Sequence, residues 1–86
     1  MKIDSVQDQA IAARMALIVS AATFDRLFSG ARFAEVDGDL LYAFARDEVT
    51  AAEIEERFAL HISIVASGIL KREIAVVLVL PTELAR

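Results

Sequence analysis

The chain of 86 residues has no cysteine, one histidine, one proline and three glycines. Without cysteine it can form neither a disulfide nor a thiolate metal site, a composition that fits a reducing cytoplasm. Three scattered glycines do not make a phosphate-binding loop. The single histidine, His61, lies on an apolar helical stripe, so no Ser-His-acid set is assembled around it. Asp37 and Asp39, on one tight turn, supply too few oxygens for calcium. We therefore expect no catalytic residue, metal, cofactor or enzymatic activity.

Export and membrane signals are also missing from this sequence. Asp4 and Asp8 lie where a signal peptide carries positive charge. The apolar run Ile74–Leu80 has seven residues, whereas about 20 are needed to span a bilayer. We therefore expect a cytoplasmic protein with no membrane association.

Apolar residues, in contrast, are abundant. They make up 57% of the chain, above the usual ~45–50%. A chain of this length forms one domain, residues 1–86, and buries only roughly 60% of its unfolded surface. So much apolar surface is hard to bury in so small a domain, and we expect a homodimer or a tightly held partner.

The acidic residues are concentrated in the middle of the chain. Between positions 35 and 56, eight acids and one base give a net charge of −7, whereas the whole chain carries −4. These acids are Glu35, Asp37, Asp39, Asp47, Glu48, Glu53, Glu55 and Glu56. They predict a partner-binding surface for a basic nucleic-acid-binding protein; the alternative is a solvated face. Direct DNA binding is disfavoured, because DNA affinity rests largely on Lys and Arg that neutralise phosphates.

The first third of the chain predicts one long helix over residues 5–29. Asp4 or Ser5 caps its start, and Gly30 ends it. Its apolar stripe is Val6, Ala10, Ala13, Leu17, Ala21, Phe24 and Phe28, widened by Ile11, Met15, Ile18 and Ala22. Such a helix would be about 37 Å long, whereas a domain of this size is about 30 Å across. The helix therefore either breaks near residues 20–23 or projects into a second subunit.

The next segment, residues 32–45, predicts a β-hairpin. Asp37-Gly38 is a turn signal, because both residue types tolerate the positive φ that tight hairpin turns need. The alternative is a short helix that begins at Asp39.

The last third of the chain predicts a helix followed by a strand. Thr50 and Glu53 form a capping-box pattern at the start of the helix, and the β-branched run Ile74–Leu80 is typical of a strand. The predicted fold class is α+β: helix, β-hairpin, long helix and C-terminal strand, with a three-stranded antiparallel sheet covered by two helices. The alternative is an all-α fold with a helix-turn-helix.

That alternative rests on a resemblance confined to residues 50–72. The stretch EIEERFALHISIV, Glu53–Val65, resembles the first helix, the turn and the start of the recognition helix of helix-turn-helix regulators, and ILKR, Ile69–Arg72, continues the likeness. The resemblance implies DNA binding through the second helix.

Three departures from the helix-turn-helix pattern favour a single unbroken helix instead. Glu55 stands where the family has a small residue, and Ala59 stands where its turn has Gly. The segment His61–Ile64 lacks the polar or basic groups that read base edges. A continuous helix accommodates all three, with Glu55 exposed. Its core stripe would be Ile54, Phe58, Ile62, Val65 and Ile69.

Three functional hypotheses follow. The first is a non-enzymatic inhibitor or regulator that binds a nucleic-acid-binding protein as a nucleic-acid mimic, in the manner of small phage and mobile-element proteins such as anti-CRISPR proteins and antiactivators. The second is a DNA-binding helix-turn-helix regulator that uses Lys71 and Arg72. The third is an oligomerisation module whose acids serve solubility.

Overall fold

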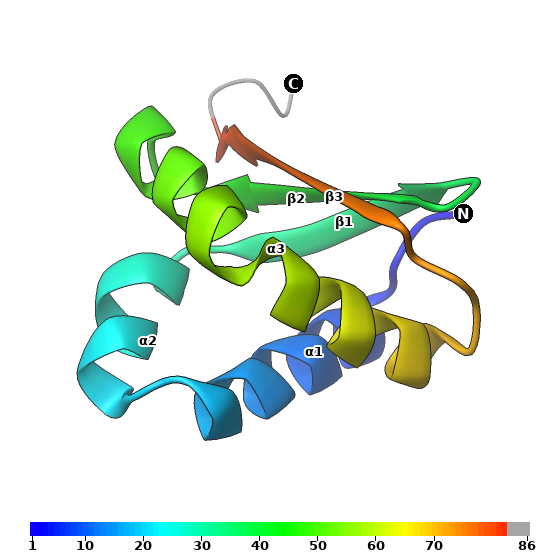
Figure 1. Cartoon of the computed structure of the whole chain (residues 1–86), viewed down its shortest axis with the longest axis horizontal. Coiled ribbons are helices and arrows are strands. Elements are labelled where there is room, and N and C mark those ends of the chain that lie inside the picture. Colours follow the sequence, from blue (N-terminus) through cyan, green and yellow to red (C-terminus); the bar gives the residue numbers. More distant parts are fainter. Residues whose placement is uncertain (83–86) are drawn as a thin grey trace.

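The computed structural model describes residues 1–82 and forms a single sheet with its helices on one side (Figure 1). The elements are α1 Ser5–Ile18, α2 Ala21–Phe28, β1 Arg32–Asp37, β2 Leu40–Ala45, α3 Glu48–Leu70 and β3 Val76–Pro81. Helix α3 lies between the sheet and α1 (Figure 1). The predicted α+β class, with a hairpin and a C-terminal strand, is confirmed.

The sheet has the strand order β1-β2-β3 and is mixed. β1 and β2 are antiparallel, whereas β2 and β3 are parallel, with Leu40 opposite Val76 and Ala45 opposite Pro81. The expectation of a fully antiparallel sheet is therefore wrong. The helix-length connection α3 carries the chain back to the end of the sheet where β2 begins, so β3 runs in the same direction as β2.

The hairpin turns at Gly38-Asp39, with Asp37 opposite Leu40. Gly38 has a φ of 63°, a conformation that glycine adopts without steric cost. The register shifts between Phe33 and Glu35, as in a β-bulge. In a regular strand, residues three apart such as Phe33 and Val36 would face opposite sides of the sheet. The bulge adds one residue between them, so both side chains are buried on the helix side.

The predicted long first helix is divided into α1 and α2, so the structure takes the first of the two alternatives. The break comes after Ile18, and Ser20 caps α2 by accepting a hydrogen bond from the Thr23 N–H at 3.1 Å. Asp4 caps α1 as expected, in a capping box with Gln7. The break lets the chain fold back within a domain of 29 × 29 × 22 Å.

The buried face of α1 differs from the predicted one. Ile11 and Met15 are 0% exposed, whereas Val6 and Leu17 of the predicted stripe are 73% and 83% exposed. Since apolar residues cover nearly half the circumference of this helix, periodicity alone does not select a face. The position of the neighbouring elements selects it.

Helix α3 is a single helix from Glu48 to Leu70, with no turn at Ala59. Its predicted core stripe is confirmed, because Ile54, Phe58 and Ile62 are buried. The predicted capping box at Thr50 is wrong, because the N-cap of the helix lies three residues earlier. Its N-cap is Asp47, which accepts a hydrogen bond of 2.8 Å from the Thr50 N–H.

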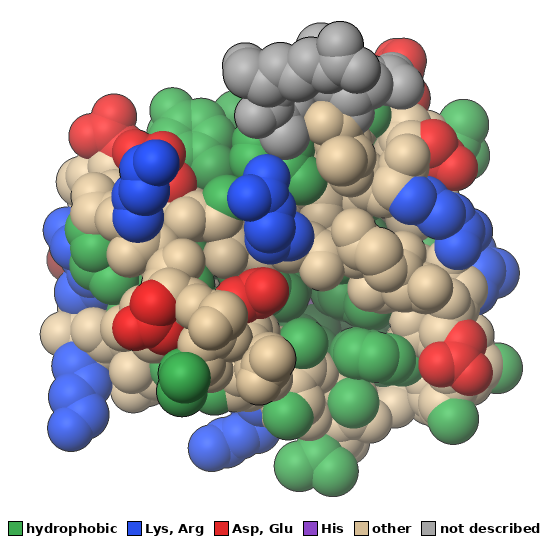
Figure 2. Space-filling model, turned by 180° about the vertical axis from the view of Figure 1, so that it is seen from behind, with side chains coloured by type: hydrophobic (Ala, Val, Ile, Leu, Met, Phe, Trp, Pro, Cys, Tyr) green, Lys and Arg blue, Asp and Glu red, His purple; other side chains and the backbone are tan. Residues whose placement is uncertain are grey.

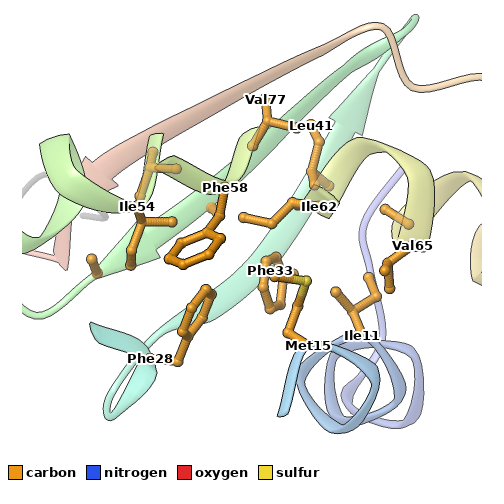
Figure 3. Packing of buried hydrophobic residues seen from close by; sticks show 14 of the residues in the cluster. Ile11, Met15, Phe28, Phe33, Leu41, Ile54, Phe58, Ile62, Val65 and Val77 are labelled. Atoms are coloured by element: carbon orange, nitrogen blue, oxygen red, sulfur yellow. The ribbon is translucent and has the colours of Figure 1, made fainter. Parts of the chain in front are cut away.

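The core lies between the sheet and the helices (Figure 3). Phe28 of α2 and Phe58 of α3 pack with ring centroids 6.0 Å apart. Ile62 lies between the sheet residues Leu41 and Val77 and the α1 side of the core (Figure 3). The core therefore joins all three helices to one face of the sheet and leaves the other face open.

Candidate functional site

The eight predicted partner-binding acids do not share one surface. Two of them have partners within the domain. Asp47 caps α3, and the hydrogen bond from the Thr50 N–H lowers the pKa of its carboxyl group. Glu53 accepts two hydrogen bonds of 2.9 Å from Arg26 and one of 2.8 Å from Arg57. These two acids therefore make contacts within the domain rather than pointing freely to a partner.

Three other acids lie at the hairpin. Glu35 and Asp37 line a shallow hollow on the open face of the sheet, together with Tyr42, Phe44 and Leu80. Asp39 lies in the turn and is exposed, and its main-chain carbonyl accepts a hydrogen bond of 2.8 Å from the Ala75 N–H. They are therefore placed on strand β1 and in the turn, away from the helix side of the sheet.

The remaining three acids line one groove between the first half of α3 and the edge strand β3. Glu48, Glu55 and Glu56 belong to α3, and seven or eight residues separate the first from the other two, which places them on neighbouring parts of one helical face. The groove has a volume of about 660 Å³. Its apolar lining comes from Ala51, Ala52, Leu78, Val79, Leu80 and Pro81.

Glu55 connects the two walls of this groove. Its carboxylate accepts a hydrogen bond of 3.1 Å from the backbone N–H of Val79, which is partly buried. The expectation that Glu55 is simply exposed is therefore wrong. The bond forms because β3 is the last strand of the sheet, and its outward amide needs an acceptor.

The groove residues on β3 were not predicted as part of a site. The strand Leu78–Pro81 reads as core, and only the tertiary structure brings it beside the acids of α3. One signal was present in the sequence: Glu48, Ala51, Ala52 and Glu55 recur at helical spacing, with small residues between acids. Small side chains leave room for a groove where large ones would fill it.

The face opposite the view of Figure 1 carries charges of both signs. In Figure 2, acidic and basic side chains are interspersed there, with hydrophobic side chains between them. That face is therefore no uniform acidic surface.

The metal-ligating residue types and the single histidine are placed as follows. Within residues 1–82, no three His, Cys, Asp or Glu side chains lie close enough together to hold a metal ion. His61 is exposed, with its ring edge-on to Phe58 at 5.9 Å. In the same part of the chain, no helix is long and apolar enough to cross a membrane.

Comparison with protein-family models and with curated proteins finds no match for this chain. The geometry of the groove is therefore the main guide to function.

Proposed function

We propose that the protein is a non-enzymatic regulator that binds a basic nucleic-acid-binding protein and blocks its nucleic-acid site. The observation that carries the proposal is the groove in which Glu48, Glu55 and Glu56 of α3 lie beside an apolar lining. Apolar contact area flanked by polar groups is typical of protein–protein interfaces. The carboxylates would attract and orient the basic surface that otherwise binds phosphates.

Three observations argue against the alternative of direct DNA binding. Arg72, one of the two basic residues on which that hypothesis depends, donates a hydrogen bond of 3.1 Å to the Gly38 carbonyl at the hairpin. The unbroken α3 has no separate recognition helix. The groove itself is lined by acids, which repel phosphates.

We also propose that the protein forms a homodimer in the cytoplasm. The support for a dimer is apolar exposure on the helices: Leu17 of α1 is 83% exposed, and Leu60 and Ile64 of α3 are 70% and 65% exposed. Exposed apolar side chains of this size favour association. The absence of cysteine from the sequence fits the reducing compartment. The alternative of an oligomerisation module needs only this apolar surface and not the groove.

A matched pair of double variants tests the groove. Partners are captured from host cells with the tagged protein, and each captured protein is assayed for nucleic-acid binding with and without it. We expect the wild type to block binding, and Glu48→Gln with Glu56→Gln to weaken the block about 10-fold or more, the equivalent of ~1.4 kcal/mol. The control, Glu35→Gln with Asp37→Asn, removes the same charge from the open sheet face.

The control variant should block as well as the wild type does. If both double variants lost blocking activity equally, the effect would come from net charge rather than from the groove. If neither variant lost blocking activity, the proposal would be overturned. An oligomerisation module predicts that neither pair changes any interaction.

A further inference from the structure

The outer edge of β3 presents backbone groups to the groove. The Val79 N–H points to Glu55 rather than to β2. Because backbone groups alternate in direction along a strand, those of Val77 point to the same edge. Pro81 has no N–H, so the edge ends there.

The two edges of the sheet differ in this respect. At the β1 edge, residues Met1–Ile3 pair with the strand: the Ile3 N–H donates to the Ala34 carbonyl at 2.9 Å, and the Val36 N–H donates to the Met1 carbonyl at 2.8 Å. Within residues 1–82, the Val79 N–H at the β3 edge donates to the side chain of Glu55 and not to a backbone carbonyl. In this part of the chain, β1 is paired along its outer edge and β3 is not.

We propose that the groove receives an extended segment of the partner as a fourth strand paired with β3, and that basic and apolar side chains alternate along this segment. This inference rests on the proposed function and deepens it. Addition of a strand to a sheet edge is a common mode of peptide recognition, in which main-chain hydrogen bonds provide affinity and alternate side chains provide specificity.

The alternation follows from the two surfaces beside β3. Val77 and Val79 are buried on the helix side, whereas Val76, Leu78 and Leu80 lie on the open face of the sheet. Successive side chains of an added strand point to the same two sides. Those on the helix side meet the acids of α3 and are basic. Those on the open side pack beside Leu78 and Leu80 and are apolar.

Glu55 exchanges partners when the strand binds. Its carboxylate leaves the Val79 N–H, and a main-chain carbonyl of the incoming strand takes that bond. The released carboxylate then pairs with a basic side chain of the segment. In the free protein, Glu55 thus occupies the edge of β3. A segment with positive charge can displace it, because the released carboxylate gains a basic partner, whereas an uncharged segment offers no such partner.

The test uses the full chain labelled with 15N and a nine-residue peptide of alternating Arg and Val. We expect saturable shifts of the Val77, Val79 and Glu55 amide signals. Amide exchange at Val77 and Val79 should slow at least about 10-fold, because the Val77 N–H gains a backbone acceptor and the Val79 N–H exchanges a side-chain acceptor for a backbone one. A second peptide of the same sequence is N-methylated at every second residue. It keeps the same charge but lacks the backbone N–H groups that would donate hydrogen bonds to β3. We expect it to bind at least about 10-fold more weakly.

The outcomes separate this inference from the proposed function. Equal binding of both peptides, with unchanged exchange at Val77 and Val79, would overturn the added strand while the groove remained a site for basic partners. No binding of either peptide would overturn both the strand and the basic-peptide chemistry. The amides of Val77 and Val79 could instead become protected from exchange without peptide, to an extent that rises with protein concentration. That result would assign the edge to a second copy of this chain and would overturn the proposed occupant.

Discussion

The carboxylate of Glu55, on α3, accepts a hydrogen bond of 3.1 Å from the backbone N–H of Val79, on the edge strand β3. This contact joins the acidic segment of the chain to the strand edge. A carboxylate at an open edge also discourages pairing with unrelated strands, because the approaching chain must desolvate and displace a charge. The same residue thus protects the edge and lines the candidate site.

Substitution of Glu55 tests this protective role. Glu55→Ala removes the acceptor, so we expect faster amide exchange at Val79 and association that increases with protein concentration. Glu55→Gln keeps a side-chain oxygen that can accept the bond, and its exchange rate should stay closer to that of the wild type. Hydrogen exchange followed by NMR and sedimentation velocity give the two readouts. Unchanged exchange in the alanine variant would contradict the role of Glu55 at the edge.

Ile62 and Ile64 are a matched pair of positions that tests which face of the unbroken α3 is buried. Ile62 is 0% exposed and Ile64 is 65% exposed. Ile62→Ala should lower the free energy of unfolding by about 2–5 kcal/mol, because it leaves a cavity in the core. Ile64→Ala should change it by less than about 0.5 kcal/mol when the proteins are compared at a concentration too low for self-association. Urea unfolding measures both, and similar losses at the two positions would contradict the helix orientation.

The ion pairs of Glu53 predict a loss of stability in acid. The two hydrogen bonds from Arg26, and then the one from Arg57, lower the pKa of Glu53 from 4.5 to about 2. A carboxyl group with a depressed pKa in the folded state stabilises the fold above its unfolded pKa and loses this contribution as the pH falls through the folded value. The contribution is therefore complete above pH 4.5 and declines toward about pH 2.

We expect Glu53→Gln to be less stable than the wild type at neutral pH, and the difference to shrink as the pH falls toward 2. Urea unfolding at several pH values provides the measurement. Glu56→Gln, the same chemical change three residues further along α3, is the control and should not show this pH dependence. A constant difference between Glu53→Gln and the wild type at all pH values would refute the assignment.

The same substitution at two glycines should have opposite effects. Gly68 lies inside α3 with no atom within 4 Å of an added Cβ, so Gly68→Ala should stabilise the protein by about 0.5–1 kcal/mol through helix propensity. Gly38 has a φ of 63° in the hairpin turn, so Gly38→Ala should destabilise it by roughly 1–2 kcal/mol. Thermal unfolding ranks the three proteins, and the same sign at both sites would contradict the described backbone.

The proposed homodimer is tested on the exposed face of α1. Val6 and Leu17 are 73% and 83% exposed. We expect Val6→Ser with Leu17→Ser to weaken self-association in sedimentation equilibrium without loss of helical content. Val76→Ser, on the open face of the sheet, is the comparison variant. A wild-type monomer at every concentration would remove the basis of the dimer proposal.

Local features of the fold were predictable because their causes are close together in sequence. Asp4 as a helix cap, the turn near Gly38, and the stripe from Ile54 to Ile62 each depend on neighbours within a few residues. The start of α3 was placed wrongly because Thr50 and Asp47 are both good caps, and the structure uses Asp47. The candidate site was predictable only in part, because the acids Glu48, Glu55 and Glu56 were identified but their groove was not.

The sequence by itself determined the order of helices and strands, the α+β class and the concentration of acidic residues. The tertiary structure alone decided that β3 runs parallel to β2, that Ile11 rather than Leu17 is buried, and that three acids of α3 line one groove with the edge strand β3. These outcomes depend on contacts between residues far apart in the chain. Helical periodicity and charge describe which side chains are available, whereas packing around one shared core selects the face that each element buries and the residues that remain together outside it.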